Sequence, residues 1–276
     1  MQINDLDVAI KAVIRASEII AESYGNFKQL DFKSDIDVVT EVDFRCEEAI
    51  TKILRDETPE YGIIAEEGTS CPGGKVWIVD PLDGTINFSH SFPLFGPSIG
   101  LCKGNEVLVG VIADPVRKEL FYASKGNGAF LNDLYNKGEP KRLHVSNVSK
   151  MKQAIVASSL PYNRDGEYYE KMGRKFVALE KEIQSTRKLG MAALTMAYIA
   201  AGRLEGYIVT GAKSWDMAGG IAILEEAGGK ITNYKGEPYT LDTFEWLASN
   251  GHLHENFVEI YNCLLYTSDA ADEEAS

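Results

Sequence analysis

Apolar residues near the beginning of the chain recur at the spacing of one face of a helix. The pattern covers residues 5–23. Asn4 or Asp5 can cap this helix, because a short polar side chain accepts a hydrogen bond from a free N–H group of the first turn. The polar residues 31–37 follow, and we expect them to form a mobile loop.

A second helix is expected after residues 38–43. Its apolar face consists of Phe44, Ala49, Ile50, Ile53 and Leu54. Thr40 and Asp43 have the spacing of a capping pair, in which each side chain accepts a hydrogen bond from the backbone of the other. Two amphipathic helices of this kind need an apolar surface to pack against.

Short apolar runs between turn residues predict a largely antiparallel sheet in the first half of the chain. The runs lie at residues 62–65, 76–79, 98–103, 106–113 and 119–123. Gly104 and Asn105 have the composition of a hairpin turn. Two helices packed on such a sheet would give the first half an α+β organisation.

In the second half, expected strands alternate with expected helices. The strands lie at residues 154–158, 183–185, 206–209, 230–232 and 246–249, and the helices at 166–179, 190–201 and 215–227, with a last helix from about His254. This alternation predicts an α/β unit. We therefore divide the chain into residues 1–148 and 149–266. Residues 267–276 lack apolar periodicity and are expected to be disordered, with a non-native origin as an alternative.

The stretch from Lys75 to Phe88 carries the most specific pattern. A buried strand over residues 76–79 should end at Asp80, because Pro81 has no N–H group to donate. Asp83 follows three residues later, so that a tight turn can bring the two carboxylates together. The turn that follows can offer backbone N–H groups to an anion. Solvated turn acids are the alternative reading, but the end of a buried strand favours a ligand site.

Further acids follow other expected strands. Glu66 comes directly after residues 62–65, and Asp216 begins a helix after residues 206–209. Four carboxylates at one point would repel one another unless cations lay between them. A set of oxygen ligands without His or Cys favours Mg²⁺ over Zn²⁺. Whether the four acids converge is left open by the sequence.

The composition of the 276 residues is that of an ordinary globular protein, with 45% hydrophobic and 25% charged residues. A formal net charge of -13 argues against nucleic acid or an anionic lipid surface as the main partner. The four cysteines lack Cys-x-x-Cys spacing and the four histidines lack a zinc pattern, so we expect reduced thiols and read His252 and His254 as structural or exposed. Without an apparent signal peptide or membrane-spanning run, a cytoplasmic location is expected.

Residues 77–88 resemble the first motif of the inositol monophosphatase family. Residues 215–220, running on to Gly229, resemble its second motif, and residues 39–43, 65–68 and 189–194 match further family positions. The resemblance spans residues 4 to 262. It implies a layered αβαβα fold of the inositol monophosphatase and fructose-1,6-bisphosphatase type, usually dimeric. It also implies a Mg²⁺-dependent, Li⁺-sensitive phosphatase.

The same resemblance implies metal ligands by position. Glu66, Asp80 and the carbonyl of Leu82 would hold one ion. Asp80, Asp83 and Asp216 would hold a second, and Glu66 would share a third. The active site would thus take two to three Mg²⁺ ions.

The resemblance also assigns catalytic roles to Thr85, Asp43 and Glu66. Backbone N–H groups of Gly84 and Thr85 would bind phosphate, and the Thr85 hydroxyl, bonded to Asp43, would orient the attacking water. The implied substrate-binding residues are Glu66, Leu82, Asp83, Gly84, Thr85, Gly190, Met191, Ala192, Thr210, Lys213 and Asp216. Lys33 is either near the outer shell of the metals or a solvated loop lysine.

Substrate choice is less defined. The resemblance places Thr210 where inositol-preferring members carry an acid, and Lys213 nearby is either a contact for a second anionic group or an exposed charge. Residues 88–93 resemble the inositol-phosphatase branch, which favours inositol monophosphate as substrate. The alternatives are the 2′-phosphate of NADP, 3′-phosphoadenosine 5′-phosphate, fructose 1,6-bisphosphate, histidinol phosphate, and a non-catalytic relative that binds phosphate or metal.

Overall fold

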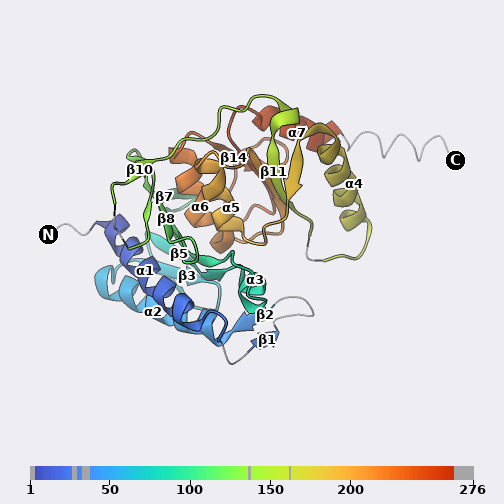
Figure 1. Ribbon diagram of the computed structural model, residues 1–276. Coiled ribbons are helices and arrows are strands. Elements are labelled where there is room, and N and C mark those ends of the chain that lie inside the picture. The colour runs from blue at the N-terminus through green and yellow to red at the C-terminus, as the bar shows by residue number, and fades with distance from the viewer. Residues whose placement is uncertain (1–3, 27–29, 33–37, 136–137, 162, 264–276) are drawn as a thin grey trace.

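The computed structural model describes residues 4–26, 30–32, 38–135, 138–161 and 163–263, which form alternating layers of helices and sheets (Figure 1). The first layer consists of α1 (Asp5–Ser23) and α2 (Glu41–Glu57). An eight-stranded sheet, a central pair of helices and a five-stranded sheet follow. Helices α4 (Glu167–Glu182) and α7 (His254–Cys263) form the last layer. The expected αβαβα sandwich is confirmed.

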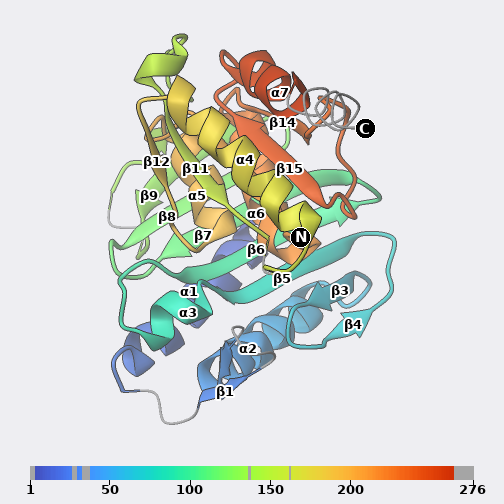
Figure 2. The same ribbon diagram turned by 90° about the vertical axis from the view of Figure 1, so that its right-hand side faces the viewer.

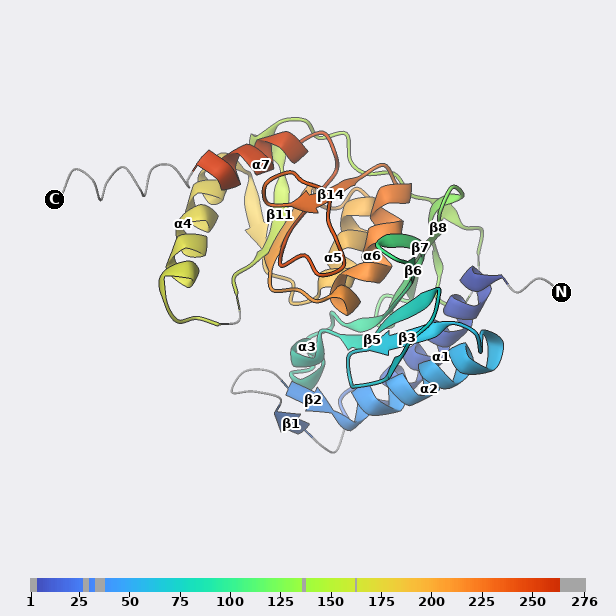
Figure 3. The same ribbon diagram turned by 180° about the vertical axis from the view of Figure 1, so that it is seen from behind.

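The eight-stranded sheet has the order β10-β9-β8-β7-β6-β5-β3-β4. Its strands in chain order are β3 (Gly62–Ala65), β4 (Ser70–Cys71), β5 (Val76–Asp83), β6 (Gly96–Lys103), β7 (Glu106–Asp114), β8 (Glu119–Ser124), β9 (Gly128–Asp133) and β10 (Lys141–Arg142). Neighbours pair antiparallel except β3 and β5, which are parallel. Figure 3 shows α1 and α2 on one face of this sheet. The antiparallel organisation predicted for the first half is therefore confirmed.

The five-stranded sheet has the order β12-β11-β13-β15-β14. Its strands are β11 (Ile155–Ser159), β12 (Ser185–Arg187), β13 (Gly206–Thr210), β14 (Lys230–Asn233) and β15 (Glu245–Ser249). A short hairpin of β1 (Leu30–Phe32) and β2 (Val38–Thr40), a single 3-10 turn (Met151–Gln153) and α3 (Thr85–Ser89) complete the described elements. Strands β11, β12 and β13 run parallel, so their carboxyl ends lie at one edge of the sheet.

The central layer consists of α5 (Ala192–Ala200) and α6 (Ser214–Glu226), which lie between the two sheets (Figure 2). Helix α6 approaches β6 and β7 closely because glycines line the contact. A Cβ atom on Gly110 would lie 2.1 Å from the carbonyl oxygen of Gly219, and one on Gly100 would lie 2.7 Å from Cβ of Ala218. This close packing fixes the position of α6 relative to the eight-stranded sheet.

The helix starts agree with the sequence. The Asn4 side chain accepts a hydrogen bond from the N–H group of Leu6 at 3.2 Å, and helix α1 has the predicted bounds. At α2, Thr40 and Asp43 form the predicted reciprocal capping box. Both helices bury an apolar face on the first sheet. On α2 the prediction for Phe44 is wrong, because this residue lies two positions, or about 200° around the helix, from the buried Val42 and Cys46 and is 50% exposed.

Several limits of strands and helices differ from the prediction. Strand β12 covers Ser185–Arg187 rather than residues 183–185, because α4 runs to Glu182 and Ile183 caps it. Two other differences lie close to the acids of β5. Strand β5 does not stop at Asp80 but continues to Asp83, with a register shift between the pairs Asp80–Ser98 and Asp83–Gly96. The bulge takes up Pro81, whose missing N–H group is tolerated at such a position. Helix α5 begins at Ala192 rather than at residue 190, because Gly190 is left-handed with φ +75°.

The described thiols are free. Cys46 and Cys102 are buried, Cys71 is half-buried, and none of the three forms a disulfide, which confirms the reading of these three as reduced. Among the described helices, none has both the length and the apolar character needed to cross a bilayer. The expectations for Lys33 and for residues 267–276 lie outside the described residues.

His254 is a structural histidine whose protonation should limit stability in acid. It is buried, with Nε2 2.9 Å from the Thr232 hydroxyl and Nδ1 2.8 Å from the Ser249 hydroxyl. Burial first, and then the nearby Lys230 charge, lowers its pKa to about 4, while Glu255 opposes this shift. The unfolded chain therefore takes up the proton first, and stability is lost as the pH falls from about 6.5 towards 4.

We expect the free energy of unfolding to fall by about 2 kcal/mol more in the parent protein than in His254→Gln between pH 7.5 and pH 5. Denaturant titrations of both proteins at the two pH values measure this difference. Equal losses in parent and variant would show that His254 is not the titrating group.

Candidate functional site

Asp80 lies in the bulge of β5 and is almost completely buried, at 1% exposure. One of its carboxylate oxygens accepts a hydrogen bond from the N–H group of Leu82 at 3.0 Å. Burial raises the pKa of Asp80 well above its usual value, and the charges of Glu66, Asp83 and Asp216 raise it further. These four acids, which are far apart in sequence, are thus within electrostatic reach of one another.

Asp83 connects the bulge of β5 to the central layer. Its carboxylate accepts hydrogen bonds from the N–H groups of Ala192 at 3.3 Å and Ala193 at 2.8 Å, and so caps the start of α5. Its pKa is also raised, first by burial and then by Asp216, although the two backbone hydrogen bonds oppose the shift. Asp83 therefore fixes the beginning of α5 beside the end of β5.

Asp216 lies in the first turn of α6, on the side of the site opposite β5. Its carboxylate accepts a hydrogen bond from the N–H group of Lys213 at 2.7 Å, which closes the turn before the helix. The neighbouring Trp215 packs against the central core. The Lys213 side chain points into solvent and has no ion-pair partner among the described residues.

Glu66 lies in a turn that is held by a residue the sequence reading missed. The buried carboxylate of Glu47, on α2, accepts hydrogen bonds from the N–H groups of Glu67 at 2.7 Å and Thr69 at 3.0 Å. Glu66 itself donates its N–H group to the carbonyl of Val79 at 3.2 Å. The polar residues Asp43, Glu47 and Thr51 follow one another at intervals of four on the buried side of α2, and this spacing is the signal that could have identified Glu47.

Thr85 and Asp43 meet across the start of α3. The Thr85 hydroxyl is 2.9 Å from Oδ1 of Asp43 and 3.0 Å from the carbonyl oxygen of Leu82. The other oxygen of Asp43 accepts from the N–H group and the hydroxyl of Thr40 at 2.9 Å and 2.6 Å. Asp43 thus caps α2 and holds Thr85 at the same time. Burial raises the pKa of Asp43, although its hydrogen bonds oppose this.

Gly84 provides the turn from β5 into α3. Its φ of +89° is left-handed, and a Cβ atom there would lie 3.0 Å from the carbonyl oxygen of Leu94 and 3.2 Å from Cγ of Met191. Glycine is therefore required by both the backbone conformation and the space. The turn leaves the backbone N–H groups at the start of α3 for an anion, in agreement with the arrangement expected from the sequence.

Asn87 is a second residue whose role the sequence reading missed. Its side-chain amide donates to the carbonyls of Leu94 at 2.8 Å and Leu189 at 2.9 Å. It also lies against Gly190, where a Cβ atom would be 3.1 Å from its nitrogen. Asn87 therefore ties the α3 turn to residues 190–192, so that these three residues reach the site as the sequence expected.

Thr210 is a candidate whose side chain the structure directs away from the acids. Its hydroxyl is 2.9 Å from the buried hydroxyl of Tyr234, and its register partner is Glu245. Strand alternation explains this direction, because Val209 packs in the core around α5 and α6. Val209, rather than Thr210, is thus turned towards the layer that carries Asp216.

The residues fit a group of divalent cations by their chemistry. The acids provide oxygen ligands only, and their burial favours a cation between them. Ser98, the register partner of Asp80, adds a fully buried hydroxyl without a hydrogen-bond partner in the described chain. Within the described ranges, no three acidic, His or Cys side chains lie in an arrangement that could hold one metal ion. Mg²⁺ suits such an open set, because it retains waters and takes substrate oxygens as ligands.

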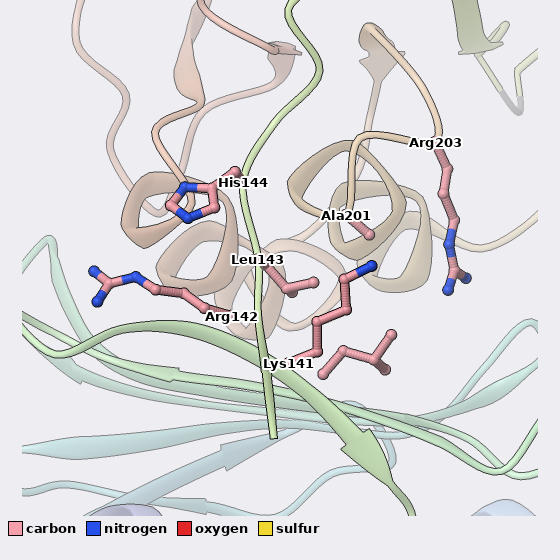
Figure 4. Close-up of a pocket in the computed structure, with 7 residues that line it drawn as sticks. Lys141, Arg142, Leu143, His144, Ala201 and Arg203 are labelled. Carbon is pink, nitrogen blue, oxygen red and sulfur yellow. The ribbon is translucent and has the colours of Figure 1, made fainter. Parts of the chain in front are cut away.

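A cavity of about 200 Å³ lies away from these acids, between β9, β10 and the end of α5. Its lining includes several cationic side chains, but Figure 4 shows Arg142 and His144 on one side of the segment and Lys141 on the other. Arg203 is already paired with Glu119, at 2.7 Å and 2.5 Å. These cations do not converge on one anion, so the acids around β5 are the better candidate for the functional site.

The comparison with known proteins shows the family of the chain. A model of the inositol monophosphatase family matches residues 2–265. The chain belongs to the inositol monophosphatase family. This is a family of metal-dependent phosphoric monoester hydrolases, and the chain is an enzyme of that class.

Relatives cover nearly the whole chain. Inositol monophosphatase 1 of Solanum lycopersicum is 36% identical over 270 residues, which are 95% of this chain and 96% of that protein. The fructose-1,6-bisphosphatase/inositol-1-monophosphatase of Thermotoga maritima is 33% identical over 258 residues, or 93% and 95% of the two chains. The crystal structure of extragenic suppressor protein suhB from Bartonella henselae superposes with a TM-score of 0.85 at 31% identity, and covers 93% of this chain and 97% of its own.

Glu47 provides a test of how the turn at Glu66 is held. In Glu47→Gln, one of the two N–H groups would face an amide nitrogen instead of an oxygen, so the turn should loosen. We expect the affinity for Mg²⁺ to fall about tenfold, as is typical when a supporting hydrogen bond behind a metal ligand is lost. Isothermal titration calorimetry with Mg²⁺ measures this. The control is Glu48→Gln, an exposed neighbour on α2 that should leave the affinity unchanged. Equal affinity in all three proteins would contradict the role of Glu47.

Proposed function

We propose that the protein hydrolyses a small phosphomonoester with Mg²⁺, and that inositol monophosphate is the substrate to test first. The proposal is supported chiefly by one observation: the turn where Thr85 bonds to Asp43 follows Asp80, which is within electrostatic reach of Glu66, Asp83 and Asp216. This combines a site for divalent cations with a place for phosphate at the start of α3.

The proposal assigns one set of residues to the metal ions and another to the phosphate and the attacking water. Bound Mg²⁺ would supply an activated water and neutralise charge on the phosphate. The groups that would hold Mg²⁺ are Glu66, Asp80, Asp83, Asp216 and the carbonyl of Leu82.

At the α3 turn, the backbone N–H groups of Gly84 and Thr85 receive phosphate oxygens. Because the Thr85 hydroxyl donates its proton to Asp43, its lone pairs can accept a hydrogen bond from the attacking water and orient it in line with phosphorus. Asp43 keeps this arrangement fixed through its bonds to Thr40.

Two observations bear on the choice of substrate: the names of similar proteins and the position of Lys213. Relatives that match nearly all of the chain are named as inositol monophosphatases, and one is named for fructose 1,6-bisphosphate as well. Lys213 is an exposed, unpaired cation of the described chain, which would suit a second anionic group of a substrate. The alternatives that carry a second anionic group are fructose 1,6-bisphosphate, NADP with its 2′-phosphate, and 3′-phosphoadenosine 5′-phosphate. Histidinol phosphate is an alternative without one. We also propose, from the family, inhibition by Li⁺ and a homodimer.

Phosphate release tests the proposal. Inositol 1-phosphate, fructose 1,6-bisphosphate, NADP, 3′-phosphoadenosine 5′-phosphate and histidinol phosphate are each offered with Mg²⁺, with EDTA, and with Mg²⁺ plus Li⁺. Release that needs Mg²⁺ and is suppressed by Li⁺ is expected, with inositol 1-phosphate preferred. In Thr85→Ala, kcat should fall at least about a hundredfold, because the water loses its orienting group. Thr85→Ser keeps the hydroxyl and should retain most of the rate.

Two results would count against this account. Equal rates in Thr85→Ala and the parent would remove Thr85 from the mechanism while leaving the metal site intact. The absence of release from every substrate, with Mg²⁺ bound, would favour the non-catalytic reading instead.

A further inference from the structure

Two large aromatic side chains stand exposed beside the loop that leads from β13 to Asp216. Phe244 is 56% exposed and Tyr168 is 38% exposed, and their ring centroids are 6.2 Å apart. The two residues come from different parts of the chain, because Phe244 precedes β15 and Tyr168 is in the first turn of α4. Exposed aromatics held together in this way mark a contact surface rather than a random feature.

The pair is fixed in place although it faces solvent. The N–H group of Gly211 donates to the carbonyl of Phe244 at 2.7 Å, and the Tyr168 hydroxyl donates to Glu245 at 2.8 Å. Thr210 and Glu245 are register partners, so both anchors lie at the same end of the five-stranded sheet. Two aromatic rings with little freedom to lose on binding are well suited to a flat ligand.

Phe244 is continuous with the proposed active site through Gly211. A Cβ atom on Gly211 would lie 3.6 Å from the Phe244 ring, and the φ of +84° also favours glycine. The loop continues through Lys213, whose backbone N–H group donates a hydrogen bond to the Asp216 carboxylate. Along this path Val209 faces the central layer and the Thr210 hydroxyl is taken by Tyr234, so that Lys213 is the charged side chain of the loop.

We propose that Phe244, backed by Tyr168, forms an aromatic rim that binds the leaving group of the substrate when that group carries a flat ring, such as a nucleobase. This inference rests on the proposed function, because it gives the chemistry of the alcohol that the phosphatase releases. Stacking of a base on an aromatic ring needs no specific hydrogen bonds, so Phe244 and Tyr168 suffice for this contact. A second copy of this chain is the competing occupant of the rim.

Three esters of secondary alcohols test the rim, because the bond to be broken is alike in all of them. They are adenosine 2′-phosphate, inositol 1-phosphate and glycerol 2-phosphate, each assayed with Mg²⁺. In Phe244→Ala, KM for adenosine 2′-phosphate should rise about tenfold, with the other two esters changed less than about twofold. Tyr168→Ala should raise KM for adenosine 2′-phosphate only, and by less than Phe244→Ala does. Tyr168→Phe keeps the ring and loses only the hydrogen bond to Glu245, so it should raise this KM less still. Tyr135→Ala removes an equally exposed tyrosine on another surface and serves as the control.

The possible failures can be separated. The rim would be overturned if Phe244→Ala changed KM equally for all three esters, or left KM for adenosine 2′-phosphate unchanged. Phosphate release by the parent would then still support the proposed phosphatase function. A lower oligomeric state of Phe244→Ala in analytical ultracentrifugation would overturn it in favour of a contact between copies. If the parent releases no phosphate, the proposed function fails, and the same esters can be titrated calorimetrically with Mg²⁺. Tighter binding of adenosine 2′-phosphate that Phe244→Ala abolishes would then still support the rim, and equal binding would overturn it.

Discussion

The fold holds four acidic side chains close together although their negative charges repel one another. Packing brings Glu66, Asp80, Asp83 and Asp216 within electrostatic reach, and burial raises the pKa values of Asp80 and Asp83 because ionised carboxylates are poorly solvated there. Without cations these acids oppose folding, and the rest of the molecule must hold them together. In the function proposed for this site, the same repulsion would favour the binding of divalent ions, since a bound cation would remove the repulsion and replace the lost solvation.

The contacts that hold these acids together come from several layers of the fold. Gly110 and Gly219 let α6, which carries Asp216, lie directly against the first sheet. Asp83 caps α5 with its carboxylate, so that one acid both belongs to the site and fixes the central layer to β5. On the other face, α2 contributes Asp43 to Thr85 and Glu47 to the turn at Glu66. The site is therefore assembled where helices from both sides of the eight-stranded sheet reach the same strand end.

Much of this could be predicted from local sequence signals, and the failures have physical causes. The bounds of α1, the Thr40–Asp43 box and the acids that follow strands depend on neighbours in sequence, and patterning alone identified them. Strand β5 was placed too short, because a bulge can accommodate Pro81 and continue the pairing to Asp83. Glu47 and Asn87 were missed because their hydrogen bonds join segments that only the tertiary fold brings together. The direction of the Thr210 side chain depends on strand alternation and on its hydrogen bond with Tyr234. Tyr234 lies outside the second motif, so the motif alone could not predict this contact.

Thermal unfolding of the parent and of Asp80→Asn, in EDTA and in Mg²⁺, tests the central claim most directly. The asparagine keeps an oxygen for the N–H group of Leu82 and removes one charge from the cluster. We predict that the variant is more stable than the parent in EDTA, by about 1 kcal/mol or more, and that Mg²⁺ stabilises the parent much more than the variant. Asp114→Asn is the control, because this buried acid is paired with Arg117 at 2.9 Å and its loss should destabilise the protein in both buffers. A variant of Asp80 that is less stable than the parent in EDTA, and equally stabilised by Mg²⁺, would contradict the account.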